Sequence, residues 1–261
     1  MKIIVFVKQV PDTDDVKLDP KTGNLQREGV QSIMNPLDAN AVETALRLKE
    51  KYGGSVVAVS MGPPQADDVL KKALAMGCDE SALLSDRALG GADTLATGYP
   101  LAKAAEKLGD YDLLICGRHA TDAETAQTGP VTAGFLGLPL VTSVSELSVE
   151  DGWAVCTREF ALGVEKCRVR LPAVITVKPE LNTPRFQTPA NVIAGLKKPL
   201  KVWDSAALGS DSSKTGVCGS PSRTKRVVAP PARSMDTEVI GGSNEEMAGA
   251  LAALLAGEHL I

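Results

Sequence analysis

The chain has 261 residues, of which 44% are hydrophobic and 23% charged, and this is enough to bury a full core. Its net charge of −4 excludes the basic surface that nucleic acids and anionic membranes require. No stretch is apolar for long enough to cross a membrane, and the apolar run at residues 3–7 is too short for a secretory signal. We therefore expect no nucleic-acid partner, no membrane insertion and a location in the cytoplasm or an organelle matrix.

Residues typical of metal sites and of catalysis are sparse. The five cysteines are scattered and there are two histidines, without a CxxC motif or a Cys/His cluster, so we expect neither a metal site nor a disulfide scaffold. The GxGxxG, GxxxxGK[ST], GxSxG and HExxH motifs do not occur. The sequence therefore gives no support to an enzyme that acts through its own side chains, and we assign no catalytic residue.

The first 140 residues alternate strand and helix patterns. Apolar runs predict buried strands at residues 3–7, 56–60 and 113–116, with shorter ones at 82–84 and 140–141. Amphipathic patterns predict helices from residue 39 to Gly53, after Pro64 as far as Gly77, and from Thr94 to Leu108 with Asp93 as N-cap. Pro100 in the third helix predicts a kink or a late start. Such alternation predicts an α/β fold with a doubly wound parallel sheet.

The second half of the chain has a different pattern. Residues 154–160 and 165–171 predict a β-hairpin, and residues 174–177 another strand. Residues 178–201 are rich in Pro and Asn and have little periodicity, so we expect irregular structure there. Residues 209–234 have low complexity, which is typical of a linker or of an arm that lies on a partner. A final helix follows, with Ser243 and Glu246 as a capping box. We expect an α/β nucleotide-binding domain over residues 1–200 and a C-terminal arm and helix over residues 201–261.

The clearest local feature is GRHATDAETAQTGP at residues 117–130. It follows an apolar strand and precedes a helix, and ligands of open α/β sheets bind at the carboxyl ends of the strands. Thr125, Gln127, Thr128 and Gly129 supply hydroxyls, an amide and a flexible backbone where the helix begins, which is a favourable place for a phosphate. An ordinary capped loop would have a similar composition, so the motif alone leaves both interpretations open.

Other strand ends carry similar residues. GGADTLATG at residues 90–98 places Thr94 and Thr97 at a helix start, where they either bind a phosphate or help to cap the helix. Lys8 follows the first strand and Met61-Gly62 another, so both should border the same crevice. A lone Lys8 is also compatible with a solvated side chain.

Several of these motifs together resemble the beta subunit of electron-transfer flavoproteins. The matching stretches are VKQVPD at 7–12, MNPLDANAVETALRLKE at 34–50, SMGPPQ at 60–65, KKALAMGCD at 71–79, the loop at 117–130, and LPAVITVKPELNTPRF at 171–186. They occur in the same order over nearly the whole chain. The resemblance implies a fold of the adenine-nucleotide alpha-hydrolase type and a heterodimer with an alpha subunit that holds a redox FAD.

The family has two branches that differ in their beta-subunit ligand. In the respiratory branch the beta subunit carries a structural AMP, and in the electron-bifurcating branch it carries a second FAD that takes hydride from NADH. GADTLAT at 91–97 and GSPSRTKRV at 219–227 are similar to the bifurcating branch. The resemblance thus implies FAD, with AMP as the alternative, and NADH oxidation only as part of the heterodimer. An ATP-binding stress-type homodimer of similar fold is a third possibility, although the Gly-rich phosphate motif of that class is not seen.

The resemblance also implies the site residues and the partners. The nucleotide contacts fall on Phe6, Val7, Lys8, Asn35, Met61, Gly62, Asp122, Ala123, Glu124, Thr125, Ala126, Gln127, Thr128 and Gly129. At the GADT motif, Asp93 belongs to the site, and Thr94 and Thr97 should reach the pyrophosphate or ribityl part of FAD. The segment from Asn182 to Asn191 matches the loop that docks onto an acyl-CoA or other flavin dehydrogenase. A ferredoxin or flavodoxin is the second acceptor, and the C-terminal arm and helix dock on the alpha subunit.

Overall fold

The computed structural model describes residues 1–12, 31–222 and 237–261. Contacts divide the chain into two units, Met1–Lys225 and Arg226–Ile261, and each is described by itself.

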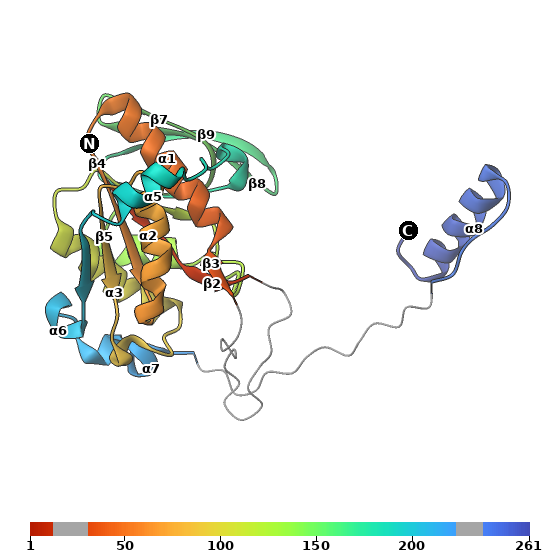
Figure 1. Cartoon of the computed structure of the whole chain (residues 1–261). Coiled ribbons are helices and arrows are strands. Elements are labelled where there is room, and N and C mark those ends of the chain that lie inside the picture. The colour runs from red at the N-terminus through yellow and green to blue at the C-terminus, as the bar shows by residue number, and fades with distance from the viewer. Residues whose placement is uncertain (13–30, 223–236) are drawn as a thin grey trace. The chain divides into compact units, whose positions relative to one another are not determined.

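The first unit is built on one large sheet (Figure 1). Its strand order is β11-β5-β4-β1-β6-β10-β7-β8-β9. Its strands are β1 (Lys2–Phe6), β4 (Ser55–Met61), β5 (Glu80–Leu84), β6 (Leu113–Gly117), β7 (Leu140–Glu150), β8 (Trp153–Phe160), β9 (Gly163–Arg170), β10 (Ala173–Val177) and β11 (Leu200–Trp203). The pairs from β11 through β7 are parallel, whereas β7, β8 and β9 pair in antiparallel fashion. The sheet is therefore parallel at its centre, as the alternating pattern predicts, and carries a hairpin at one edge.

Helices cover both faces of the sheet (Figure 1). The longer ones are α1 (Pro36–Tyr52), α2 (Asp67–Met76), α3 (Thr94–Leu108), α4 (Thr128–Leu136) and α5 (Pro189–Gly195). Side chains alternate along β1, so Ile3 and Val5 join the apolar core under α1 and α2, while Ile4 and Phe6 join the core under α3 and α4. This two-sided burial explains why the parallel strands have continuous apolar sequences.

Short elements complete the first unit. They are β2 (Gln9–Pro11) paired with β3 (Ser32–Met34), the 3-10 turns η1 (Pro64–Ala66), η2 (Arg87–Leu89), η3 (Pro179–Leu181) and η4 (Ser212–Lys214), and the short helices α6 (Ser205–Leu208) and α7 (Gly216–Gly219).

Most of the expected elements are confirmed, and three expectations need correction. Helix α3 begins at Thr94 and continues through Pro100, so a late start is wrong. The stretch 178–201, expected to be irregular, contains α5 and the start of β11, which pairs with β5 at the sheet edge. Residues 209–222, expected to belong to an arm, carry η4 and α7, and Thr215 and Ser220 there are buried. Residues 223–234 of the expected arm lie outside the described residues.

The second unit contains helix α8 (Asn244–Gly257). The capping box is confirmed, because Ser243 accepts a hydrogen bond from the Glu246 amide and the Glu246 carboxylate accepts one from the Ser243 amide. Beyond its first turn the helix is composed of Ala, Gly, Leu and Met only. None of the helices among the described residues has the length and hydropathy needed to cross a membrane.

Candidate functional site

The topology of the sheet marks one place as a ligand crevice. From β1 the chain adds β4 and β5 on one side, and it then returns to place β6 on the other side of β1. The loops after β1 and β6 consequently leave the carboxyl edge of the sheet in opposite directions. Open α/β sheets bind ligands at such a switch in strand order. Lys8 follows β1 and the loop at residues 117–129 follows β6, so the two predicted loops meet at this point.

An ion pair joins these two loops. Lys8 Nζ lies 2.6 Å from Asp122 Oδ1 and 2.7 Å from Oδ2, and the Asp122 side chain is only 6% exposed. The two residues are 114 positions apart in sequence. The pair therefore holds the first half of the loop against the end of β1.

A buried carboxylate from α1 ties the same two strand ends together. Asp38 Oδ2 accepts a hydrogen bond from the Lys8 amide (2.8 Å), and Oδ1 accepts one from the Gly117 amide (3.0 Å). A Cβ on Gly117 would lie 2.6 Å from Asp38 Oδ1, so this approach requires glycine. Burial raises the pKa of Asp38 to about 7, although both amide hydrogen bonds act in the opposite direction. The sequence analysis did not single out Asp38.

Asn35 supports the loop from the same side. Its amide nitrogen donates to the His119 carbonyl (2.9 Å), and its amide oxygen accepts from the Thr121 backbone (3.2 Å). Asn35 is completely buried. Both ends of the side chain thus fix the backbone of the predicted nucleotide loop.

The second half of the loop ends at the N-terminus of α4, which has no side-chain cap. Gln127 occupies the N-cap position, and its side chain makes no capping hydrogen bond. The first bond inside the helix runs from the Val131 amide to the Gln127 carbonyl, and Pro130 has no amide hydrogen. Among the described residues, the amides of Thr128 and Gly129 consequently have no hydrogen-bond acceptor. Free amides at the positive end of a helix favour an anionic ligand.

The start of α3 lies beside this helix end. Thr94 Oγ1 is 3.3 Å from Gln127 Oε1, which links the GADT motif to the loop. The two helices are packed closely, because a Cβ on Gly98 would meet Val131 Cγ1 at 2.5 Å. Asp93 caps α3 by accepting hydrogen bonds from the amides of Leu95 and Ala96. The structure thus brings the GADT motif and the loop into contact.

The remaining predicted site residues differ in their burial and in their contacts with the loop at residues 117–129. Phe6 and Val7 are buried, so their backbone is the part available to a ligand. Met61 is the last residue of β4 and Gly62 follows it, and no hydrogen bond among the described residues joins them to the loop. Thr97 is half-buried in the first turn of α3. The loop residues Ala123, Glu124, Thr125 and Ala126 are exposed, and Glu124 and Ala126 have the positive φ angles of 49° and 52°.

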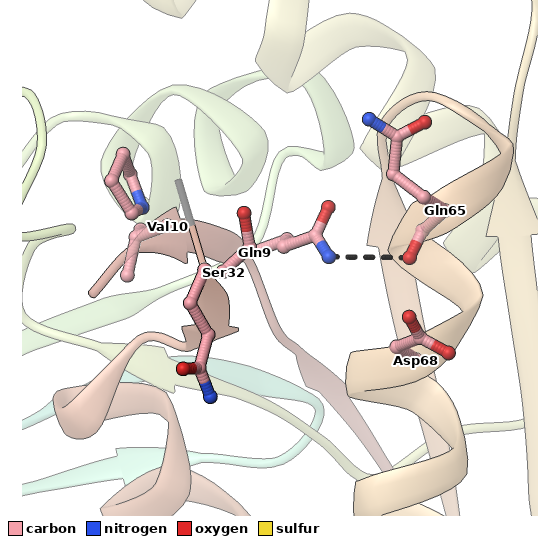
Figure 2. Close-up of a pocket in the computed structure, with 7 residues that line it drawn as sticks. Gln9, Val10, Ser32, Gln65 and Asp68 are labelled. Carbon is pink, nitrogen blue, oxygen red and sulfur yellow. Dashed lines mark hydrogen bonds between the residues drawn. The ribbon is translucent and has the colours of Figure 1, made fainter. Parts of the chain in front are cut away.

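Two clefts lie near this edge of the sheet, and the predicted nucleotide residues line neither. One of about 420 Å³ lies between the β2–β3 ribbon and the start of α2, where Gln9 Nε2 donates to the Gln65 carbonyl (Figure 2). The other, of about 450 Å³, is bordered by Arg118, Ser143, Phe160 and Lys178.

Comparison with known proteins identifies the family. A family model described as the electron transfer flavoprotein domain matches residues 22–208. The chain belongs to the electron transfer flavoprotein family. It is 43% identical over 262 residues to the caffeyl-CoA reductase-Etf complex subunit CarD of Acetobacterium woodii, with 100% of both chains covered. It is 42% identical over 261 residues to the electron transfer flavoprotein subunit beta of Clostridium acetobutylicum, again with 100% of both chains covered.

A further relative is the protein FixA of Azorhizobium caulinodans, which is 39% identical over 97% of this chain and 93% of its own length. The resemblance that the sequence motifs carried is thereby confirmed, and so is the α/β fold with a mainly parallel sheet. The printed names describe subunits: CarD is a subunit of a caffeyl-CoA reductase-Etf complex, and the Clostridium acetobutylicum protein is a beta subunit.

We predict that the pH dependence of stability differs between the wild type and the Asp38→Asn variant. The pKa of Asp38 is raised from 3.8 to about 7 on folding, so the folded chain binds more protons than the unfolded chain between these values. The stability linked to this group is present below about pH 4 and is lost as the pH rises towards about 7. In urea unfolding from about pH 4 to about pH 8, the wild type should lose stability relative to the variant as the pH rises.

The slope is the decisive quantity in this comparison. The variant also loses about 1–3 kcal/mol at every pH, because the asparagine nitrogen cannot accept one of the two amide hydrogen bonds. Parallel pH profiles for the two proteins would contradict a raised pKa of Asp38.

Proposed function

We propose that the chain is an electron-transfer flavoprotein beta subunit that binds FAD and takes electrons from NADH. The heterodimer passes one electron to a ferredoxin or flavodoxin and the other, through the FAD of the alpha subunit, to a dehydrogenase. The observation that carries this proposal is the uncapped N-terminus of α4 beside the start of α3, at the switch point of the sheet.

The arrangement of the two helix ends favours a dinucleotide over AMP. The free amides of Thr128 and Gly129 can bind one phosphate. Thr94 and Thr97 lie at the start of the neighbouring helix, and Thr94 is linked to Gln127, so their hydroxyls extend the polar surface beyond that first phosphate. A pyrophosphate uses both helix starts, whereas the single phosphate of AMP needs only α4.

The other residues of the proposed site have supporting roles. The adenosine lies at the end of β1, against the backbone of Phe6 and Val7 and the side chain of Lys8. Met61 and Gly62 border it at the end of β4, and residues 122–126 border it from the loop. Asn35 holds the loop in place. Asp93 acts through its hydrogen bonds, because its carboxylate oxygens already accept four of them.

This chain needs no acid, base or nucleophile of its own for the proposed function. A bound flavin supplies the redox chemistry, while the protein binds it and orients it. The relative CarD is named as a subunit of a caffeyl-CoA reductase-Etf complex. This name agrees with the proposal that the chain is a subunit that delivers electrons to a partner enzyme.

Helix α8 is the proposed contact with the alpha subunit. Met247, Leu251, Leu254 and Leu255 form its apolar stripe, and Leu251 and Leu254 are 50% and 47% exposed. Ala and Gly occupy the opposite side, so the helix has no strongly polar face after its first turn. A helix of this composition is stable in water only when it is covered.

The segment from Asn182 to Asn191 is the proposed docking site for the dehydrogenase. Arg185 Nε donates to Glu43 Oε2 (2.7 Å) and Nη1 to Glu50 Oε1 (2.5 Å), which fixes the segment on α1. Burial alone would raise the pKa of Glu43, but the hydrogen bonds from Arg185 and Arg47 lower it below its ordinary value. The neighbouring Phe186 is 96% exposed, so the segment presents an aromatic side chain from a fixed backbone.

The cofactor content of the purified heterodimer tests the proposal most directly. We expect two FAD molecules per heterodimer and rapid reduction of flavin by NADH. One FAD with one AMP, and no reduction by NADH, would instead identify a respiratory-type subunit with a structural nucleotide. Stable ATP binding by this chain without a partner would support the stress-type homodimer.

We predict that the double variant Gln127→Ala, Thr128→Ala loses nucleotide at the loop. Truncating both side chains at the start of α4 removes polar contacts, and retention should fall by about tenfold or more after gel filtration. The matched control is Gln187→Ala, Thr188→Ala, which changes the same residue pair at the start of α5 and should retain the nucleotide of the wild type. Unchanged cofactor content in the first variant would count against the loop assignment.

We predict that Phe186→Ser slows electron delivery to the dehydrogenase without affecting flavin reduction by NADH. Removing a large exposed anchor weakens a protein interface by about 2 kcal/mol or more, and this should raise the apparent KM for the dehydrogenase. Phe135→Ser, which alters a 40% exposed Phe on α4, serves as the comparison. An equal KM for Phe186→Ser and the wild type would exclude Phe186 from the docking site.

A further inference from the structure

A hydrogen-bonded junction connects the start of α3 to residues 211–222, which we call the exit segment. Asp93 lies at its centre. Its Oδ2 accepts hydrogen bonds from the Ser222 amide (3.1 Å) and hydroxyl (2.8 Å), and the Asp93 amide donates to Ser220 Oγ (2.9 Å). Its Oδ1 accepts from the amides of Leu95 and Ala96, both at 3.0 Å. One carboxylate thus holds both the first turn of α3 and the end of the exit segment.

Close backbone packing reinforces this junction. A Cβ on Gly91 would lie 2.7 Å from Val217 Cγ2, and a Cβ on Gly216 would lie 2.2 Å from the Ala88 carbonyl oxygen. Gly216 also has a φ of +54°, which disfavours other residues. At the other end of the exit segment, the Asp211 amide donates to the Tyr99 hydroxyl of α3 (3.0 Å). The exit segment is therefore fixed to α3 at both of its ends.

The junction joins the GADT motif to GSPS at residues 219–222, a motif whose role the proposed function left open. Asp93 directly precedes Thr94, whose hydroxyl meets Gln127 at the start of α4. Asp93 also carries a negative charge close to where the phosphates are proposed to bind, and four hydrogen-bond donors compensate that charge. If Ser222 leaves, two of these donors are lost, and the less compensated carboxylate then disfavours a nearby phosphate.

We propose that Asp93 is a positioning residue that couples nucleotide binding at the starts of α3 and α4 to the docking of the exit segment on α3. The coupling is favourable, so each event strengthens the other to the same extent. The inference rests on the proposed nucleotide site but does not depend on whether the nucleotide is AMP or FAD.

The test uses the full chain with ADP as the probe and Ser222→Ala as the variant. We expect this variant to bind ADP about 3- to 10-fold more weakly than the wild type. Ser222→Thr keeps a hydroxyl and should restore most of the affinity. The control is Ser148→Ala, because the Ser148 hydroxyl also donates to a carboxylate, Glu150 Oε1 at 3.3 Å, but lies on β7 outside the exit segment and the proposed site. It should bind ADP like the wild type.

A second measurement follows hydrogen exchange in the exit segment. Saturating ADP should slow hydrogen exchange of the amides at residues 216–222 in the wild type, and this protection should be smaller in Ser222→Ala. If the wild type binds ADP but Ser222→Ala equals Ser148→Ala and exchange in the exit segment is unchanged, the coupling is wrong while the nucleotide site stands. If the wild type does not bind ADP at all, the nucleotide site is wrong and the coupling falls with it.

Discussion

The geometry of the nucleotide loop depends on one buried carboxylate. Asp38 accepts hydrogen bonds from the backbone amides of Lys8 and Gly117 and thereby holds the ends of β1 and β6 at a fixed separation. Without such an acceptor, two backbone amides at the carboxyl edge of the sheet would be buried without partners, which is costly. The Lys8–Asp122 ion pair and the Asn35 amide then build on this fixed frame and carry the loop from β6 to α4. The free amides at the start of α4 are therefore presented by a backbone that is held from three sides.

Local patterns were sufficient to predict much of the fold. Helix α3 starts at Thr94 and ends at Leu108, because Asp93 caps it and Gly109 stops it, and both signals are readable in the sequence. The parallel strands are recognisable by their continuous apolar runs, since both of their faces are buried. Helix α5 and strand β11 were missed because they are short and lie among prolines, and only their packing against α2 and β5 stabilises them.

The partners within the site were harder to predict than its position. The rule that ligands bind at the carboxyl edge of a parallel sheet was enough to group Lys8, the loop and the GADT motif. The pairing of Lys8 with Asp122 spans 114 positions, and that of Asp93 with Ser222 spans 129, so no local pattern reveals them. Asp38 shows the same limit, because an acidic residue in the first turn of a helix is ordinary there. Its role becomes visible only when two distant strand ends lie beside it.

Helix α8 has a consequence for how such a protein is made in a cell. Its eleven residues from Met247 to Gly257 contain no charged or hydrogen-bonding side chain. A newly synthesised copy therefore exposes an apolar, aggregation-prone helix until another surface covers it. If the alpha subunit covers this helix, as proposed above, copies produced in excess of that subunit would tend to aggregate or be degraded. Matched production of the two chains is thus a demand that the amino-acid composition of a single helix places on the expression of its genes.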